Sequence, residues 1–488
     1  MQRPVALAGL ALIVATSSTR AETLADAIAL AYQSNPVLQA QRANLRATDE
    51  TYVQAQAGYR PTITAQGLIT TNENTETFTQ PVPGNSQTTS AVITLTQPIY
   101  TGGRVASQLS AAQATVMAGR ETLRSTEQQV LQQVIQAYID TRRDQQAVAI
   151  NKANVQLLER QLVESKARFA VGDITRTDVA ETETRVLAAR SQLAAAESQL
   201  ATSRAEYSEI VGQNPGQLAP EPSLAALLPP TLELAFAVAE HDNPQIGQQD
   251  YTEQASAAKI AAAKSQTRPT ASLQATYGYS AGAFGIDNPF QNQGHAFTAT
   301  AVVTVPLFTG GTTTSQIRQA TEANNVDRIG IEQVRRQTLF AVSQAWNQLV
   351  GSRSQLKTDE EQVGAANIAF EGTRREAQVG QRTTLDVLIT EQDFSSAELA
   401  LVAARHDEYQ AGASLLVAMG KMRAESFSPS LPVYDPVTNF DRVRHSPGWT
   451  PLEPAISALD HLGAPKIVER PDPVEPPAPA PVSSGATP

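Results

Sequence analysis

Residues 97–103 read Gln-Pro-Ile-Tyr-Thr-Gly-Gly, and residues 305–311 read Val-Pro-Leu-Phe-Thr-Gly-Gly, 208 positions later. Each segment follows an alternating, strand-like run and precedes a long stretch of helix-forming residues. Proline ends strand pairing because it has no N–H, and paired glycines permit positive φ. We therefore predict that both segments redirect a strand into a helix of different axis, through Pro98, Gly102, Gly103, Pro306, Gly310 and Gly311.

The spacing of 208 residues relates other segments as well, which indicates an internal duplication. Asn35-Pro36 recurs as Asn243-Pro244, and Arg60-Pro61-Thr62 recurs as Arg268-Pro269-Thr270. A period this long is that of a domain-sized unit and exceeds that of a short solenoid repeat. We predict two structural repeats, at 22–213 and 231–420, a proline-rich linker at 214–230, and a proline-rich tail at 421–488 with a disordered end.

Composition restricts the classes of protein that the chain can represent. The 488 residues carry a net charge of -11, include no cysteine, and are only 5% aromatic. The negative charge argues against nucleic acid as a partner, and the lack of cysteine excludes disulfides and thiolate chemistry. Residues 1–21 have the layout of a secretory signal peptide, although a short buried helix is the alternative interpretation. No later apolar run is long enough for a transmembrane helix.

Four alternating segments predict two β-hairpins, at 60–98 and 268–306. In the first strand, Ile63, Ala65 and Ile69 lie opposite Thr64 and Gln66. An apolar face opposite a threonine and glutamine face suits a barrel with lipid outside and water inside, while a soluble sandwich is the alternative. Four strands cannot close a barrel, so other copies of the chain would have to complete it, with 8 strands from two copies or 12 from three.

The remaining sequence predicts long antiparallel helical hairpins at 104–213 and 312–420. The stretch 104–169 contains no proline, and at about 1.5 Å per residue a helix of this length extends on the order of 100 Å. Apolar residues recur every seven positions on both sides of the turns, as Val179, Val186 and Leu193 do. This period is typical of coiled-coil packing. The fold class is therefore mainly α with a β contribution.

Each helical hairpin has a similar turn, and the residue types in it can both cap helices and form a seal. Gly172 and Gly380 fit a left-handed helix end, and Thr175 and Thr383 can cap the following helix. Asp178 and Asp386, three residues later, complete a capping box, which is one interpretation of these acids. The other is a set of contacts between neighbouring turns, for which Arg382 supplies the opposite charge.

With these motifs in place, the chain resembles the TolC-like outer-membrane efflux and secretion ducts over residues 22–420. The resemblance implies a homotrimer, with a 12-stranded barrel in outer-membrane lipid and an α-helical tunnel that extends into the periplasm. It also implies a gate at the helical tips, with Arg382 facing Thr177 and Asp178, and Asp386 and Glu181 supplying acids. Ile389 and Ala377 depart from the family's second acid and latching aromatic.

The resemblance implies a passive exit duct that docks to a periplasmic adaptor and to an inner-membrane ABC transporter or proton-driven pump. Type I protein secretion is the first candidate use, small-molecule efflux the second, and a soluble periplasmic coiled-coil scaffold is the alternative from another class. We expect no enzyme activity, cofactor or metal site. The sequence contains no P-loop or Gly-x-Ser-x-Gly motif, and its five histidines lack metal-ligand spacing, with His406 expected on an exposed helix face.

Overall fold

A computed structural model describes residues 21–72, 86–284, 293–429, 431–445 and 450–461 of the chain. The predicted signal peptide, except for residue 21, and the predicted disordered end of the tail lie outside these residues. The elements are, in order, α1 (Leu24–Ser34), α2 (Pro36–Gln56), the 3-10 turn η1 (Ala57–Tyr59), β1 (Thr62–Asn72), β2 (Ser86–Tyr100), α3 (Arg104–Ala170), α4 (Arg176–Val211), α5 (Leu232–Asp242), α6 (Pro244–Ser265), β3 (Thr270–Phe284), β4 (Gln293–Thr304), α7 (Thr312–Gln378), α8 (Thr384–Ala418), the 3-10 turn η2 (Ala424–Ser426), α9 (Pro436–Arg444) and α10 (Glu453–Asp460).

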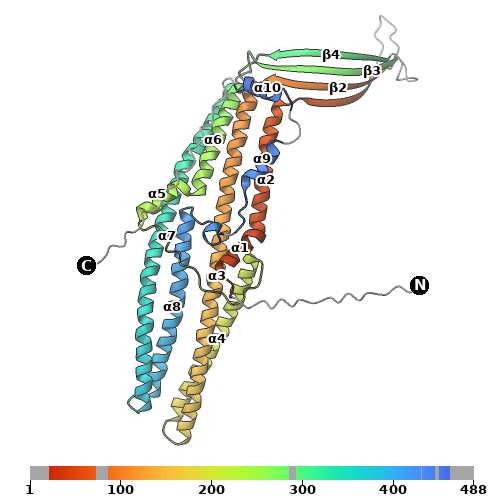
Figure 1. Ribbon diagram of the computed structural model, residues 1–488. Coiled ribbons are helices and arrows are strands. Elements are labelled where there is room, and N and C mark those ends of the chain that lie inside the picture. The colour runs from red at the N-terminus through yellow and green to blue at the C-terminus, as the bar shows by residue number, and fades with distance from the viewer. Residues whose placement is uncertain (1–20, 73–85, 285–292, 430, 446–449, 462–488) are drawn as a thin grey trace, which may run out of the picture.

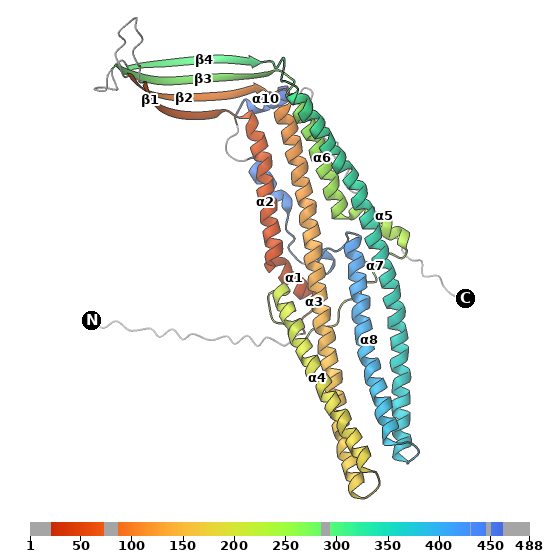
Figure 2. The ribbon, with the colours of Figure 1, turned by 180° about the vertical axis from the view of Figure 1, so that it is seen from behind.

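The molecule is elongated, with a sheet at one end and two helical turns at the other (Figure 1). The helical hairpins α3/α4 and α7/α8 run side by side, and α2 and α6 accompany their upper halves (Figure 2). Helices α3 and α7 have 67 residues each. The duplicated unit of helix, β-hairpin and long helical hairpin is therefore confirmed. Within the described part of the chain, no helix combines the length and apolarity needed to cross a membrane.

The four strands form one antiparallel sheet in the order β1-β2-β3-β4. Directly paired residues share a face of an antiparallel sheet, so the register shows how the two sets of side chains are sorted. The pairs Ile63–Leu95 and Tyr277–Phe297 lie on one face, and the pair Thr94–Thr276 lies on the other. The predicted apolar and threonine-rich faces are confirmed.

The Asn-Pro motif near the start of each repeat joins three helix ends. Asn35 caps α2 by accepting hydrogen bonds from the amides of the first turn, and its Nδ2 donates to the carbonyl oxygen of Ile210 at 3.1 Å. Asn243 does the same for α6, and its Nδ2 donates to the carbonyl oxygen of Ala418 at 2.9 Å. Proline follows each asparagine because the first helical position needs no N–H. The motif therefore satisfies carbonyl groups that the long hairpin of the same repeat leaves free at its C-terminal end.

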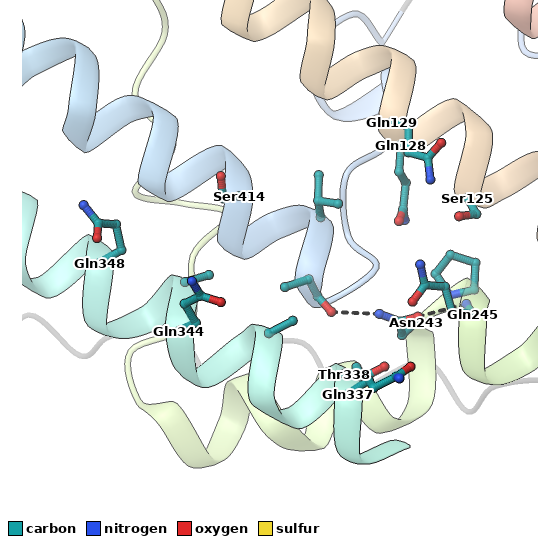
Figure 3. Close-up of a pocket in the computed structure, with 15 residues that line it drawn as sticks. Ser125, Gln128, Gln129, Asn243, Gln245, Gln337, Thr338, Gln344, Gln348 and Ser414 are labelled. Atoms are coloured by element: carbon teal, nitrogen blue, oxygen red, sulfur yellow. Dashed lines mark hydrogen bonds between the residues drawn. The ribbon is translucent and has the colours of Figure 1, made fainter. Parts of the chain in front are cut away.

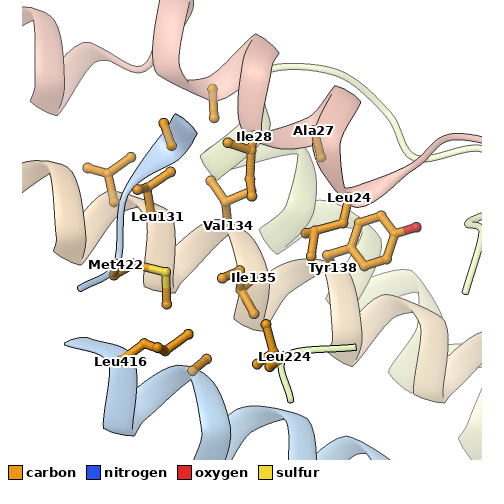
Figure 4. Close-up of a cluster of buried hydrophobic side chains, with 14 of the residues drawn as sticks. Leu24, Ala27, Ile28, Leu131, Val134, Ile135, Tyr138, Leu224, Leu416 and Met422 are labelled. Atoms are coloured by element: carbon orange, nitrogen blue, oxygen red, sulfur yellow. The ribbon is translucent and has the colours of Figure 1, made fainter. Parts of the chain in front are cut away.

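The main hydrophobic core lies at mid-height, where short helices and loops close around the long ones. Ile28 of α1, Ile135 and Tyr138 of α3, and Leu416 of α8 are buried together there (Figure 4). The linker contributes Leu224 to the same cluster, so it packs against the helices. Away from this level the helical hairpins have only a narrow apolar seam, as the seven-residue period predicts.

The tail after residue 420 has more structure than its proline content suggested. Its helix α9 packs on α2, where the ring of Phe440 meets that of Tyr52 edge-on at 5.1 Å. Asn439 donates to the buried carboxylate of Asp49 at 2.6 Å. The tail therefore returns along the first repeat towards the sheet (Figure 1).

Candidate functional site

The two helical turns share one backbone conformation. In the first turn, the amides of Gly172 and Asp173 donate to the carbonyl oxygens of Phe169 and Arg168, both at 3.0 Å. This pair of bonds is the Schellman motif, which needs a left-handed residue at its centre. Gly172 and Gly380 supply it, with φ of 80° and 76°.

The threonine and aspartate of each turn form a complete capping box. Thr175 and Asp178 bind each other's backbone amides, as do Thr383 and Asp386. Hydrogen bonds from the backbone and hydroxyl of Thr175 lower the pKa of Asp178, and those of Thr383 lower the pKa of Asp386. Both carboxylates therefore stay charged at neutral pH while they serve as caps.

Arg382 lies in the second turn and binds an acid of its own hairpin. Its Nε donates to Oε2 of Glu376 at 3.0 Å, and 53% of the arginine side chain is exposed. The contact of Arg382 with Thr177 and Asp178 that the resemblance implies is not among the described contacts within one protomer. Glu181 is half-buried on α4, one turn after the tip. A gate built from these residues therefore concerns contacts between hairpins and stays a prediction.

The seam between the two helical hairpins holds ionisable groups that the sequence analysis did not identify. His406 was expected on an exposed face, which is wrong, because only 13% of its side chain is exposed and its Nε2 lies 2.9 Å from Oδ1 of Asp140 on α3. Burial by itself lowers the pKa of His406, but the adjacent carboxylates of Asp140 and Asp407 outweigh it and raise the pKa. The long-range approach of α8 to α3 could not be read from the helical period alone.

Nearer the tips, the same seam buries Glu391. Its neighbour on α8, Leu388, packs against Val155 and Leu158 of α3. Both carboxylate oxygens of Glu391 are buried without a hydrogen-bond partner in the described structure. Burial raises the pKa of this carboxyl to about 7.

The strand-to-helix segments, which we call the first joint (97–103) and the second joint (305–311), differ in their surroundings. Pro98 does not end strand pairing as predicted, because β2 pairs with β3 through an irregularity as far as Tyr100, whereas β4 ends at Thr304, before Pro306. Both glycine pairs have positive φ, between 61° and 84°. The first joint is covered by the tail, since Asp460 accepts hydrogen bonds from the amides of Thr101, Gly103 and Ala106 at 2.8, 3.0 and 3.2 Å. The second joint is exposed, and 93% of Leu307 lies in solvent.

A cavity of about 530 Å³ lies between α3, α7, α8 and the start of α6 (Figure 3). Glutamines from α3 and α7, among them Gln128 and Gln344, project towards it, and Asn243 closes one side. Amide side chains can hydrogen-bond many solutes but supply neither a nucleophile nor a charged group. Nowhere in the described ranges do three or more histidine, aspartate or glutamate side chains gather as a metal site would require.

Comparison with known proteins identifies the family of this chain. The family described as "Outer membrane efflux protein" matches residues 27–213 and 237–421, one match in each half of the duplicated chain. The outer membrane efflux protein BepC of Brucella suis is 33% identical over 87% of this chain and 91% of its own length. The alkaline protease secretion protein AprF of Pseudomonas aeruginosa is 25% identical over 67% of this chain and 68% of its own length.

Among solved structures, the CmeC outer membrane channel of Campylobacter jejuni has the same fold. Its TM-score is 0.72 at 12% identity, and the match covers 86% of this chain and 89% of that chain. The chain belongs to the outer membrane efflux protein family.

Proposed function

We propose that the chain is a passive exit duct of the outer membrane, formed by three copies whose sheets close into one barrel of 12 strands. The observation that carries this proposal is the two-faced, four-stranded sheet, whose outer edges on β1 and β4 have no partner strand among the described residues of one protomer. Unpaired backbone groups in lipid cost several kcal/mol each, so the edges need partners. Side chains such as Ile63 and Phe297, 68% and 71% exposed, suit a lipid-facing surface.

The helical hairpins continue the duct as a tunnel on the periplasmic side. Their turns are the ends farthest from the sheet (Figure 1), so they are the parts that reach an inner-membrane partner. A periplasmic adaptor and an ABC transporter or proton-driven pump supply the energy, since the duct itself only conducts. Thr177, Asp178, Glu181, Arg382 and Asp386 form the gate in this proposal.

Small-molecule efflux is the leading use in this proposal, because the 33% identical relative is named for efflux and the match covers 87% of the chain. Type I protein secretion, the first candidate from the sequence, is supported by the likeness to AprF, which is named for alkaline protease secretion. The soluble periplasmic scaffold is wrong, because the family is one of outer-membrane proteins.

The experiment is deletion of the gene in its own host, followed by complementation with the full chain. Efflux predicts increased sensitivity to toxic small molecules with unchanged secreted proteins, whereas type I secretion predicts loss of a protein from the medium. A mass measurement of the purified protein in detergent tests the trimer. A stable monomer in detergent, or recovery of the protein in the soluble periplasmic fraction, would contradict the duct.

A further inference from the structure

The internal repeat provides a template for the contact between protomers, because the first repeat already packs against the second inside one chain. Strand β2 pairs with β3, and the pair Thr96–Gln274 is part of that register. The first joint packs on the residues just before β3. The side chain of Arg268 donates from Nη1 to the carbonyl oxygen of Gly102 at 3.1 Å.

The approach at the first joint is close enough to require glycine. A Cβ on Gly102 would lie 2.9 Å from Cβ of Arg268 and 3.1 Å from the carbonyl oxygen of Ser265. Thr101 is correspondingly only 4% exposed. The arginine of the second repeat and Asp460 of the tail therefore cover the first joint together.

The second joint has a glycine pair of the same positive φ, but no such neighbour among the described residues of the protomer. A Cβ on Gly310 would meet nothing within 4 Å, and Phe308 is 89% exposed. The strand that leads into it, β4, is an edge of the sheet, and the other edge is β1. In the repeat, β1 is the counterpart of β3 and β4 is the counterpart of β2. The two outer edges of the sheet therefore carry the counterparts of the two strands that pair inside the chain.

The counterpart of Arg268 in the first repeat is Arg60, which precedes β1. Glu453 of the tail binds its side chain. The Nε of Arg60 lies 3.2 Å from Oε2 of Glu453, and only 11% of the arginine side chain is exposed. The same carboxylate accepts a hydrogen bond from Nε2 of Gln56 at 2.6 Å. An arginine bound through Nε still has donors on its terminal nitrogens.

We propose that Arg60 of one protomer donates to the carbonyl oxygen of Gly310 in the next protomer, where it seals the second joint as Arg268 seals the first. The occupant of the exposed second joint is therefore a second copy of this chain. Transfer of the β2–β3 register by the repeat spacing of 208 residues pairs Thr304 of β4 with Gln66 of the next protomer. Through Glu453, the tail positions a residue of the protomer interface.

This inference rests on the proposed trimer but goes further, because it specifies the register and a positioning residue. The test uses the full-length protein in detergent and exploits the absence of cysteine from the chain. Oxidation of Thr304→Cys/Gln66→Cys should link protomers. Thr304→Cys/Thr70→Cys, four residues out of register, is the matched control and should link far less. Predominant cross-linking of the control pair would overturn the register.

A second measurement tests Arg60 itself through the temperature at which the oligomer dissociates. Arg60→Gln should lower it by on the order of 5 °C, because each interface loses a charge-assisted hydrogen bond. Glu453→Gln removes the ion pair that Arg60 makes within its own protomer but keeps the arginine at the interface, so it should lower it less. Equal shifts for the two variants would assign Arg60 a purely intramolecular role and overturn the proposal. An oligomer that forms but links out of register contradicts only this inference, whereas a monomer contradicts the proposed duct as well.

Discussion

The carboxylate of Asp460 accepts a hydrogen bond from the backbone amide of Thr101 at 2.8 Å, although 359 residues separate the two. Asp460 is fully buried and also binds the amides of Gly103 and Ala106. It therefore supplies the N-terminal cap that α3 lacks locally, since Gly103 has no side chain. Negative charge at this end of a helix is also favoured by the helix dipole.

Replacement of Asp460 by alanine should destabilise the protein by about 2–4 kcal/mol, because buried amides lose a charged acceptor. Chemical unfolding of the purified protein, followed by the helical circular dichroism signal, measures the change. Asp441→Ala, at an exposed position of α9, is the control and should change the free energy of unfolding little. An Asp460→Ala protein as stable as the control would show that the tail does not hold the first joint.

Replacement of Thr175 or Thr383 by alanine should loosen the tip of the corresponding hairpin. Each substitution removes the hydroxyl that caps the following helix. The amides of the first helical turn should then exchange hydrogen roughly fivefold faster, the factor expected for loss of an ordinary cap. Hydrogen exchange read by mass spectrometry gives the rate, with Thr202→Ala, inside α4, as the comparison. No change at the tip peptides would contradict a capping role.

Replacement of Glu391 by glutamine should make the protein more stable at alkaline pH and leave it unchanged at pH 4. The buried carboxyl has its pKa raised from 4.5 to about 7, so its ionisation opposes folding increasingly as pH rises between these values. The full effect above pH 7 is about 3 kcal/mol at most. Thermal unfolding across pH measures it, and Glu197→Gln on an exposed face is the control. If the difference in stability between Glu391→Gln and the unsubstituted protein did not change with pH, the effect of the substitution would come from packing and not from ionisation.

Replacement of His406 by asparagine should change the stability of the protein with the opposite dependence on pH. The folded protein raises the pKa of this histidine, so the protonated ring stabilises the seam fully below the ordinary pKa of 6.5. This contribution is lost as pH rises through the higher pKa of the folded state. His406→Asn should therefore be destabilising near pH 5.5 and less so at pH 9. Nuclear magnetic resonance titration of the ring, with exposed His445 for comparison, checks the direction of the shift.

Replacement of Arg382 by alanine should increase the conductance of the purified assembly in planar lipid bilayers, if the tips form the gate. The substitution removes a charge that binds Glu376 and acts on Asp386 of the same turn. Arg336→Ala, in the body of α7 and paired with Glu332, is the control. Conductance equal to that of the control would remove Arg382 from the gate.

Local patterns in the sequence determined the elements of this protein. Alternation of residues such as Ile63 and Thr64 has the period of a strand, and seven-residue spacing has that of a coiled coil, so each could be recognised from neighbours in the chain. The glycines at 172 and 380 were recognisable because few other residues accept positive φ. The spacing of 208 residues then showed that these elements occur twice.

Only the tertiary structure decided which distant groups meet. The contacts of Asp460 with the first joint, of Glu453 with Arg60, and of His406 with Asp140 join segments hundreds of residues apart. No local period encodes such contacts, because they depend on how the tail and the two hairpins pack in space. The sequence by itself therefore determined a duplicated α and β protomer, and packing decided which of its two joints the chain seals for itself.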